Sequence, residues 1–382
     1  MSKSNIEWTQ DTWNPIVGCS ILSPGCSNCY AMTMAARIEA MNAEARETEH
    51  ASGRKRTIAA QYDGTTRRVN GNAVWTGKLA LAPESTLLAP LKRKRPTTYF
   101  VNSMGDLFHE DCSDAWIDRV FAVMALCPQH TFQVLTKRAE RMQKYVDNAL
   151  GRVIAGTAGD WPGWPLPNVW LGVSTERQKE ADERIPELLA TPAAVRFISA
   201  EPLLGPIDLS SFPSWAKMHE GLGYKVDALS GTWKDGSRRL ISTAPKLDWV
   251  IVGGESGPGS RPMHPDWARS LRDQCAAANV PFFFKQWGEY LPVGQSLPGC
   301  GTVHGATAVK PGRMKLHYGG TPKRAPKHAF AEHGVEFASM ADDRLTFRVG
   351  KKAAGRLLDG IEHDAMPTDH RLTPANREQV PA

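Results

Sequence analysis

Three cysteines stand close together near the start of the chain, in the stretch GCSILSPGCSNCYAM at residues 18–32. Cys19, Cys26 and Cys29 form a C-x6-C-x2-C array. The last two are near enough in sequence to bind one metal centre, and the Pro-Gly pair before them supplies a tight turn that lets the first thiol reach the same point. Small and polar residues flank all three, as is typical of a loop. We interpret the array as a metal-binding loop.

Two kinds of metal centre suit three thiols. A structural zinc site takes four tetrahedral ligands. Because the chain holds no second C-x2-C pair, His109 or Cys112 would have to supply the fourth ligand. A [4Fe-4S] cluster is normally ligated by cysteine thiolates, so a set of three leaves one iron open for a small molecule. The residues by themselves leave both centres open.

The composition is that of a globular protein, with 382 residues of which 41% are hydrophobic and 23% charged. No apolar run approaches the roughly 18 residues of a membrane-spanning helix, and the N-terminus lacks the apolar segment of a signal peptide. The cysteine count is odd and four of the seven are scattered, which does not suit a secreted disulfide framework. We therefore expect a soluble, cytoplasmic protein that does not contact a membrane.

Positive charge gathers in residues 51–100. This segment holds ten Lys and Arg against two acidic residues, a local balance of 10 − 2 = +8 that exceeds the +6 of the whole chain. Such clustering suits an anionic partner, with nucleic acid as the first candidate. A solvated basic loop is the alternative interpretation.

Short apolar runs rich in β-branched and aromatic residues alternate with helical patterns, which indicates β/α units around a parallel sheet. One such helix is expected at 113–127, with Ser113 or Asp114 as its cap, and another at 264–280. The expected strands are 12–18, 98–104, 131–137, 168–174, 195–201, 248–254 and 281–287. We predict an α/β fold with a full or partial (β/α) barrel, and a doubly wound open sheet is the alternative.

Three segments depart from this alternation. Insertions are expected at about residues 43–76 and 210–246, and the pattern is lost after about residue 290. We predict a β/α domain over 1–290 and a partly irregular C-terminal extension over 291–382.

Polar residues follow six of the seven expected strands. In a barrel the carboxyl ends of all strands meet at one face, which is where the active sites of such folds lie. The side chains at these positions are Asn102, Ser103, Asp106, Thr136, Lys137, Arg138, Ser174, Glu176, Ser199, Glu201, Glu255, Ser256, Lys285 and Gln286.

The cysteine loop, with Tyr30 directly after the last thiol, resembles the cluster-binding loop of radical S-adenosylmethionine (SAM) enzymes. A closer resemblance is to the phage-associated three-Cys-motif proteins, a family of unknown function found in phages and prophages. It covers roughly residues 5–290 and implies a barrel of the radical SAM type and a partner protein. The stretches that carry it are IEWTQDTWNPIVGCSILSPGCSNCYA, VNSMGDLFHE, FQVLTKR, VWLGVSTE, RFISAEPLLGP, DWVIVGGESGPGSRPM and FFFKQWGE.

This resemblance implies two cofactors, a [4Fe-4S] cluster on the three cysteines and SAM on the open iron. Reduction of the cluster by an electron donor would then cleave SAM to a 5'-deoxyadenosyl radical that takes a hydrogen from the substrate. Glu201 and Lys285 are the candidate catalytic residues, and Lys285 is expected to pair with Glu255, unless Glu255 pairs with Arg261. The candidate cofactor-binding residues are Tyr30, Asn102, Ser103, Asp106, Lys137, Ser174, Glu201 and Glu255.

Three functions compete at this stage. The first is a radical SAM enzyme that acts on nucleic acid or a nucleotide, in DNA repair or base modification. The second is a zinc-stabilised nucleic-acid-binding module without catalysis. The third is an interaction protein with a structural cluster, whose activity resides in a partner.

Overall fold

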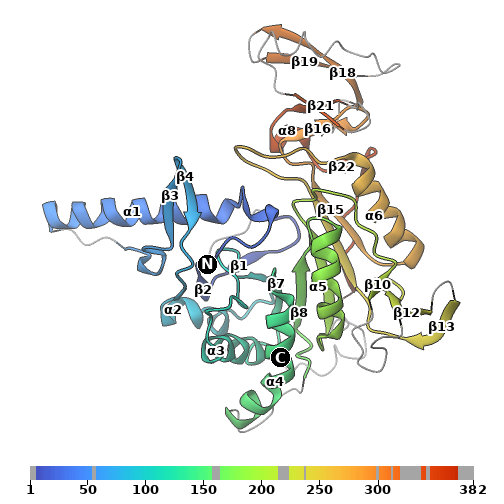
Figure 1. The fold of residues 1–382 in the computed structure, drawn as a ribbon. Helices are drawn as coiled ribbons and strands as arrows, with labels where there is room; N and C mark the ends of the chain where they lie inside the picture. Colours follow the sequence, from blue (N-terminus) through green and yellow to red (C-terminus); the bar gives the residue numbers. More distant parts are fainter. Residues whose placement is uncertain are drawn as a thin grey trace.

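The computed structural model describes residues 6–53, 57–156, 164–213, 223–235, 238–297, 301–310, 313–318, 337–340 and 345–368. Its largest element is a seven-stranded parallel sheet whose spatial order follows the chain and which curls into a half-barrel (Figure 1). The strands are β1 (Asp11–Trp13), β6 (Thr98–Val101), β7 (Thr131–Thr136), β8 (Val169–Ser174), β9 (Val195–Ala200), β14 (Trp249–Gly253) and β15 (Phe282–Gln286). The expected α/β fold is therefore confirmed as a partial (β/α) barrel.

Helices follow four of these strands and cover the outer face of the sheet. They are α3 (Asp114–Ala125), α4 (Ala139–Gly156), α5 (Gln178–Ala190) and α6 (Pro265–Ala278). Their apolar faces share one core with the sheet, to which Phe121 of α3 and Leu188 of α5 contribute fully buried side chains. At the start of α3 the Ser113 side chain accepts a hydrogen bond from the backbone N–H of Trp116, as expected of a cap.

The first expected strand, 12–18, divides in two. β1 joins the main sheet beside β6, whereas β2 (Ile16–Val17) pairs with the short β5 (Ala80–Leu81). Pro15 lies between them, and proline has no N–H to donate to a continuing ladder. The division directs the chain away from the sheet just before the cysteine loop.

The concave face of the half-barrel holds its own aromatic cluster. Trp8 lies 4.8 Å from Phe100 and 6.1 Å from Trp249 between ring centroids, and Trp170, Phe197 and Phe283 pack around them. These rings point inward from β6, β8, β9, β14 and β15, because alternate residues of a strand face the same side. They fill the lower part of the half-barrel and leave its carboxyl end open.

The regions outside the β/α order form small antiparallel sheets. The expected insertion boundary at residue 43 falls inside the long helix α1 (Tyr30–Ser52), so the departure begins after α1 and contains the hairpin β3 (Thr66–Val69) and β4 (Asn72–Trp75). The 210–246 region forms the sheet β10 (Phe212–Pro213), β11 (Lys225–Asp227), β12 (Thr232–Asp235) and β13 (Arg238–Thr243). The short helix α2 (Glu84–Leu87) precedes β6.

The C-terminal extension also contains regular structure in its described parts. Its elements are β16 (Tyr290–Pro292), β17 (Ser296–Leu297), β18 (Gly301–Lys310), β19 (Arg313–Tyr318), β20 (Phe337–Ser339), β21 (Leu345–Arg348), α8 (Lys351–Ala354), β22 (Leu357–Leu358) and β23 (Ile361–Glu362). Beyond β23 the chain returns to the edge of the main sheet, where the Phe284 N–H donates to the His363 carbonyl at 2.8 Å. An edge strand exposes unpaired backbone groups, and this segment covers some of those of β15.

Asp359 ties this returning segment to α6. Its carboxylate accepts hydrogen bonds from Arg269 and Arg272 of α6 and from Gln295. The hydrogen bond from Arg269, above all, lowers the pKa of Asp359. Because the pKa in the folded protein lies below the ordinary value of about 3.9, ionised Asp359 stabilises the contact above that pH, and this contribution is lost as the pH falls.

We expect Asp359→Asn to weaken the attachment of residues 357–365 by about 1 kcal/mol at pH 7, since a partly exposed ion pair contributes little more. Amide hydrogen exchange of this segment measures the change. Asp273→Asn is the matched control. Asp273 is more exposed than Asp359, and it pairs with Arg272 but not with Arg269. At pH 3 the wild type should have moved only part of the way toward the variant, because the lowered pKa keeps Asp359 largely ionised in the folded protein. Equal protection of wild type and variant at pH 7 would contradict the assignment.

No helix in the described ranges is long and apolar enough to cross a membrane.

Candidate functional site

A cavity of about 440 Å³ opens at the carboxyl end of the half-barrel. It is lined by the three cysteines and by every residue that the sequence offered as a cofactor-binding or catalytic candidate, although these come from seven separate parts of the chain. They are Cys19, Cys26, Cys29, Tyr30, Asn102, Ser103, Asp106, Lys137, Ser174, Glu201, Glu255 and Lys285. The structure brings them together because parallel strands place their carboxyl ends at one edge.

The cysteine loop is held from the opposite side of the cavity. Residues Pro24–Cys26 form a short 3-10 turn, and Cys29 directly precedes α1. Arg261, from the segment after β14, donates to the Pro24 carbonyl at 2.9 Å. Asn28 donates to the Gly259 carbonyl, also at 2.9 Å. These two bonds close the loop over the half-barrel.

The three thiols share the cavity without converging on one point. Among the described residues, no group of three or more His, Cys, Asp or Glu side chains is arranged to hold a metal ion. The proposed fourth zinc ligands are engaged elsewhere: His109 Nε2 lies 2.9 Å from Ser20 Oγ, and Cys112 is buried in the hydrophobic core. Neither residue lines the cavity.

The thiols differ in how readily they ionise. Burial raises the pKa of Cys19 to about 12, and the Asp106 carboxylate adds to this effect. Burial also raises the pKa of Cys29. For Cys26 burial is outweighed by the Lys137 ammonium and by hydrogen bonds to the sulfur, so that its pKa is lowered. Cys26 is therefore the thiol that most easily supplies the thiolate that a metal requires.

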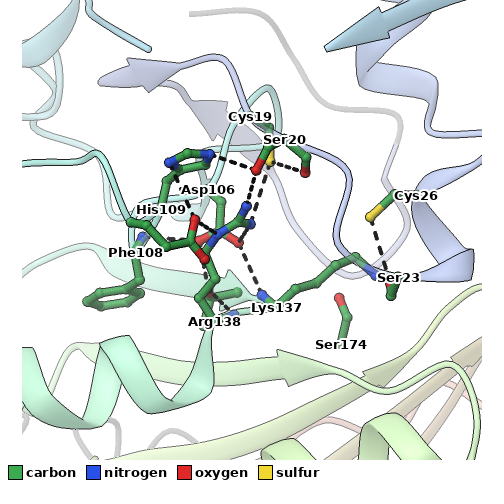
Figure 2. A network of polar contacts seen from close by, with 12 residues as sticks. Cys19, Ser20, Ser23, Cys26, Asp106, Phe108, His109, Lys137, Arg138 and Ser174 are labelled. Atoms are coloured by element: carbon green, nitrogen blue, oxygen red, sulfur yellow. Dashed lines mark hydrogen bonds and ion pairs between the residues drawn. The ribbon is translucent and has the colours of Figure 1, made fainter. Parts of the chain in front are cut away.

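Asp106 organises the polar network beside Cys19 (Figure 2). One carboxylate oxygen accepts from Thr136 Oγ1 at 2.6 Å and the other from Arg138 Nη1 at 3.0 Å. Arg138 in turn donates to Ser20 Oγ at 2.7 Å and contacts Cys19 Sγ at 3.7 Å. Because both oxygens of Asp106 already accept hydrogen bonds, the side chain positions the end of β7 and the first part of the cysteine loop.

Asn102 and Ser103 shape the cavity through their backbone. Asn102 adopts a positive φ of 58°, which turns the chain sharply after β6. The Tyr30 hydroxyl donates to the Ser103 carbonyl at 2.8 Å, and the Ser103 hydroxyl lies 3.1 Å from Asn14 Oδ1. This strand end therefore fixes the start of α1.

Glu176 is a residue whose importance the sequence did not indicate. Its side chain is fully buried, pairs with Lys137 and accepts from Arg184 Nη1 at 3.0 Å. It also accepts a hydrogen bond from Ser23 Oγ at 2.7 Å, and Ser23 lies 3.7 Å from Cys26 Sγ. Glu176 thus connects the ends of β7 and β8 to the second half of the cysteine loop. In the sequence, Glu176 was marked only as one of the polar residues that follow the fourth expected strand.

The prediction that Lys285 pairs with Glu255 was wrong. Lys285 Nζ donates to both oxygens of Glu201, at 2.7 and 3.0 Å. Glu255 instead binds Arg261, whose Nη2 lies 2.6 Å from Glu255 Oε1. The alternative interpretation of Glu255 as scaffolding is therefore confirmed, since Arg261 also anchors the cysteine loop.

The basic segment 51–100 does not gather on one surface. Arg54, Lys55 and Arg56 lie outside the described residues. Arg67 and Arg68 are exposed on the β3–β4 hairpin, whereas the exposed residues of 92–95 precede β6 and lie at the amino end of the sheet. The amino end is opposite the cavity, whereas the hairpin lies beside α1 (Figure 1). The exposed Lys78 is next to the cysteine loop, because the N–H of the preceding Gly77 donates to the Cys19 carbonyl at 3.2 Å.

Comparison with known proteins gives one family. A family model described as "Protein of unknown function (DUF5131)" matches residues 3–367. No curated protein and no solved structure matches the chain.

Proposed function

The chain belongs to the DUF5131 family, and because that family has no assigned function, we propose one from the cavity: an iron-sulfur enzyme of the radical SAM type. The cluster would be [4Fe-4S], ligated by Cys19, Cys26 and Cys29. SAM would bind in the same cavity. The observation that carries the proposal is the position of three thiols in one cavity at the carboxyl end of a parallel half-barrel.

The arrangement of the thiols favours a cluster over a single zinc ion. A tetrahedral zinc with Zn–S bonds of about 2.3 Å requires sulfur atoms within about 3.8 Å of one another. In the ranges that the structure describes, no group of three or more His, Cys, Asp or Glu side chains is arranged to hold a metal ion. A cluster is ligated at separate iron atoms, so three thiols that line one cavity would have to move less to bind it than to bind a single zinc ion.

The residues around the thiols support the same interpretation. Lys137 and Arg138 place positive charge beside Cys26 and Cys19, which stabilises an anionic thiolate-ligated group. The cluster, held by Cys19, Cys26 and Cys29, would supply one-electron reduction of SAM as the source of a radical for hydrogen abstraction. Of the chain's own residues, Tyr30, Asn102 and Ser103 line the cavity together with the thiols.

We extend the proposal to a substrate that is nucleic acid or a nucleotide, in repair or base modification. The part of the basic segment that supports this class is the exposed pair Arg67 and Arg68, which lie on the hairpin packed against α1. An electron donor and a partner protein would complete the system.

Metal analysis of protein purified without oxygen tests the proposal. We expect about four iron and four sulfide per chain, as for one [4Fe-4S] cluster, and an electron paramagnetic resonance spectrum of the reduced protein that shifts when SAM is added. Reduced protein should also convert SAM to 5'-deoxyadenosine. Equimolar zinc without iron or sulfide would overturn the proposal and favour a zinc-stabilised binding module, and a cluster that does not bind SAM would overturn the enzyme assignment.

A further inference from the structure

One wall of the cavity carries a row of polar side chains whose hydrogen-bonding capacity is not fully used by other protein groups. Ser174 and Ser199 are register partners on β8 and β9, and Glu201 follows two residues later on the same side of the chain as Ser199. Lys285 on β15 completes the row, and all four line the cavity. Because alternate residues of a strand share a face, these side chains belong to the concave side of the half-barrel.

The ion pair of this row spans a whole strand. Glu201 follows β9 and Lys285 lies on β15, with β14 between them in the sheet. Gly253 of β14 lies under the crossing point, where a Cβ atom would stand 3.2 Å from Glu201 Cδ. That distance is tighter than ordinary van der Waals contact, so the absence of a side chain at Gly253 allows the two charged groups to meet above the strand.

The pair retains hydrogen-bonding capacity. An ammonium has three donors and a carboxylate about four acceptor sites. In the part of the chain that the structure describes, Lys285 donates two hydrogen bonds to Glu201, and neither side chain makes a further hydrogen bond. Their side chains are 13% and 20% exposed, so they are largely withdrawn from bulk water. An unused donor and an unused acceptor therefore lie next to each other at the cavity wall.

The two serines add to this capacity. Ser174 is 5% exposed and Ser199 is 2% exposed, yet neither hydroxyl makes a hydrogen bond within the described residues. Neither oxygen is among the fully enclosed polar atoms that lack a partner, so both hydroxyls reach the cavity. Across the wall, the Lys285 ammonium therefore presents a donor and the Glu201 carboxylate an acceptor. The two serine hydroxyls follow, and each can donate or accept.

The floor next to this wall is apolar and partly aromatic. Ile6, Trp8, Phe100 and Leu135 line the cavity, and the two rings belong to the aromatic cluster of the concave face. A site with one apolar aromatic side and one row of alternating donors and acceptors complements a planar ring with polar atoms along its edge.

We propose that this row binds the edge of a heterocyclic ring whose N–H lies beside a carbonyl, as in uracil, thymine or guanine. Lys285 donates to the carbonyl and Glu201 accepts from the ring N–H, while Ser174 and Ser199 bond the next polar atom. The inference rests on the proposed function, for which it identifies the reacting part of the substrate as a nucleobase. The position suits that role, because the row lines the same cavity as the three cysteines.

Calorimetric titration of the full chain with nucleosides tests the assignment. We expect uridine or guanosine to bind at one site, and its N-methylated counterpart, 3-methyluridine or 1-methylguanosine, to bind at least tenfold more weakly because it lacks the ring N–H. Lys285→Met should reduce the affinity of the parent nucleoside by a similar factor. Lys352→Met, which removes an exposed lysine outside the cavity, should leave it unchanged.

A second variant tests the site even if Lys285→Met does not fold. Gly253→Ala keeps both charges but places a methyl group against Glu201, so we expect weaker nucleoside binding with an almost unchanged thermal unfolding temperature. Three results would overturn the proposal: no binding of uridine or guanosine at millimolar concentration, equal binding of the methylated nucleosides, or a loss in Lys285→Met of SAM affinity alone. The titration needs no iron. If the protein held no cluster, the proposed function would be wrong, but the nucleoside affinities would still test this site independently.

Discussion

Replacement of any one of Cys19, Cys26 and Cys29 by serine is expected to reduce the iron content of anaerobically purified protein from about four per chain to less than one. The reason is that the cluster has only three protein ligands in this proposal, so no neighbouring thiol can take the place of a lost one. Of the other described cysteines, Cys112, Cys127 and Cys275 are buried in the core and none lines the cavity.

Cys275→Ala is the matched control for this measurement. Cys275 is fully buried on α6 and packs in the main core, so its replacement changes packing without touching the cavity. We expect the iron content to stay at the wild-type value, together with a modest loss of stability. If all three loop variants retained four irons, the ligand assignment would be wrong, and SAM cleavage by such variants would exclude the cluster proposed here.

Glu176→Gln is expected to lower the free energy of unfolding by about 3–5 kcal/mol, which is typical when one partner of a buried ion pair is removed. Glu176 is fully buried and faces two cations, Lys137 and Arg184, whose side chains are 19% and 6% exposed. The amide can still accept from Ser23, but it cannot neutralise the two charges. Urea unfolding followed by circular dichroism measures the difference.

The control for this prediction is Glu140→Gln. Glu140 pairs with Lys144 on the surface of α4, where both side chains are more than half exposed. Exposed pairs of this kind contribute at most about 1 kcal/mol, so the control should unfold almost as the wild type does. A loss of the same size in both variants would show that Glu176 has no special role. We also expect Glu176→Gln to incorporate less iron, because Ser23 and Cys26 lose their anchor.

The sequence predicted the architecture of the half-barrel well. Five of the seven expected strands lie within one residue of the observed ones at both ends, because each is a short apolar run between polar ends and is buried on both faces. A sixth, expected at 98–104, begins at the expected residue but ends at Val101, where Asn102 turns the chain. The first strand differs because Pro15 interrupts the ladder. The candidate site residues also gather in one cavity, since the topology of parallel strands requires that residues after each strand meet at one edge.

What the sequence determined by itself is therefore local or topological: the cysteine loop, the alternation of strands and helices, and the face at which polar residues collect. Only the tertiary structure decided the partners. Lys285 pairs with Glu201 and not with Glu255 because Gly253 opens the way across β14. Glu176 became a central residue only when its strand end met Lys137, Arg184 and Ser23. Such pairings depend on ångström-scale distances between residues far apart in the chain, and no local pattern records those distances.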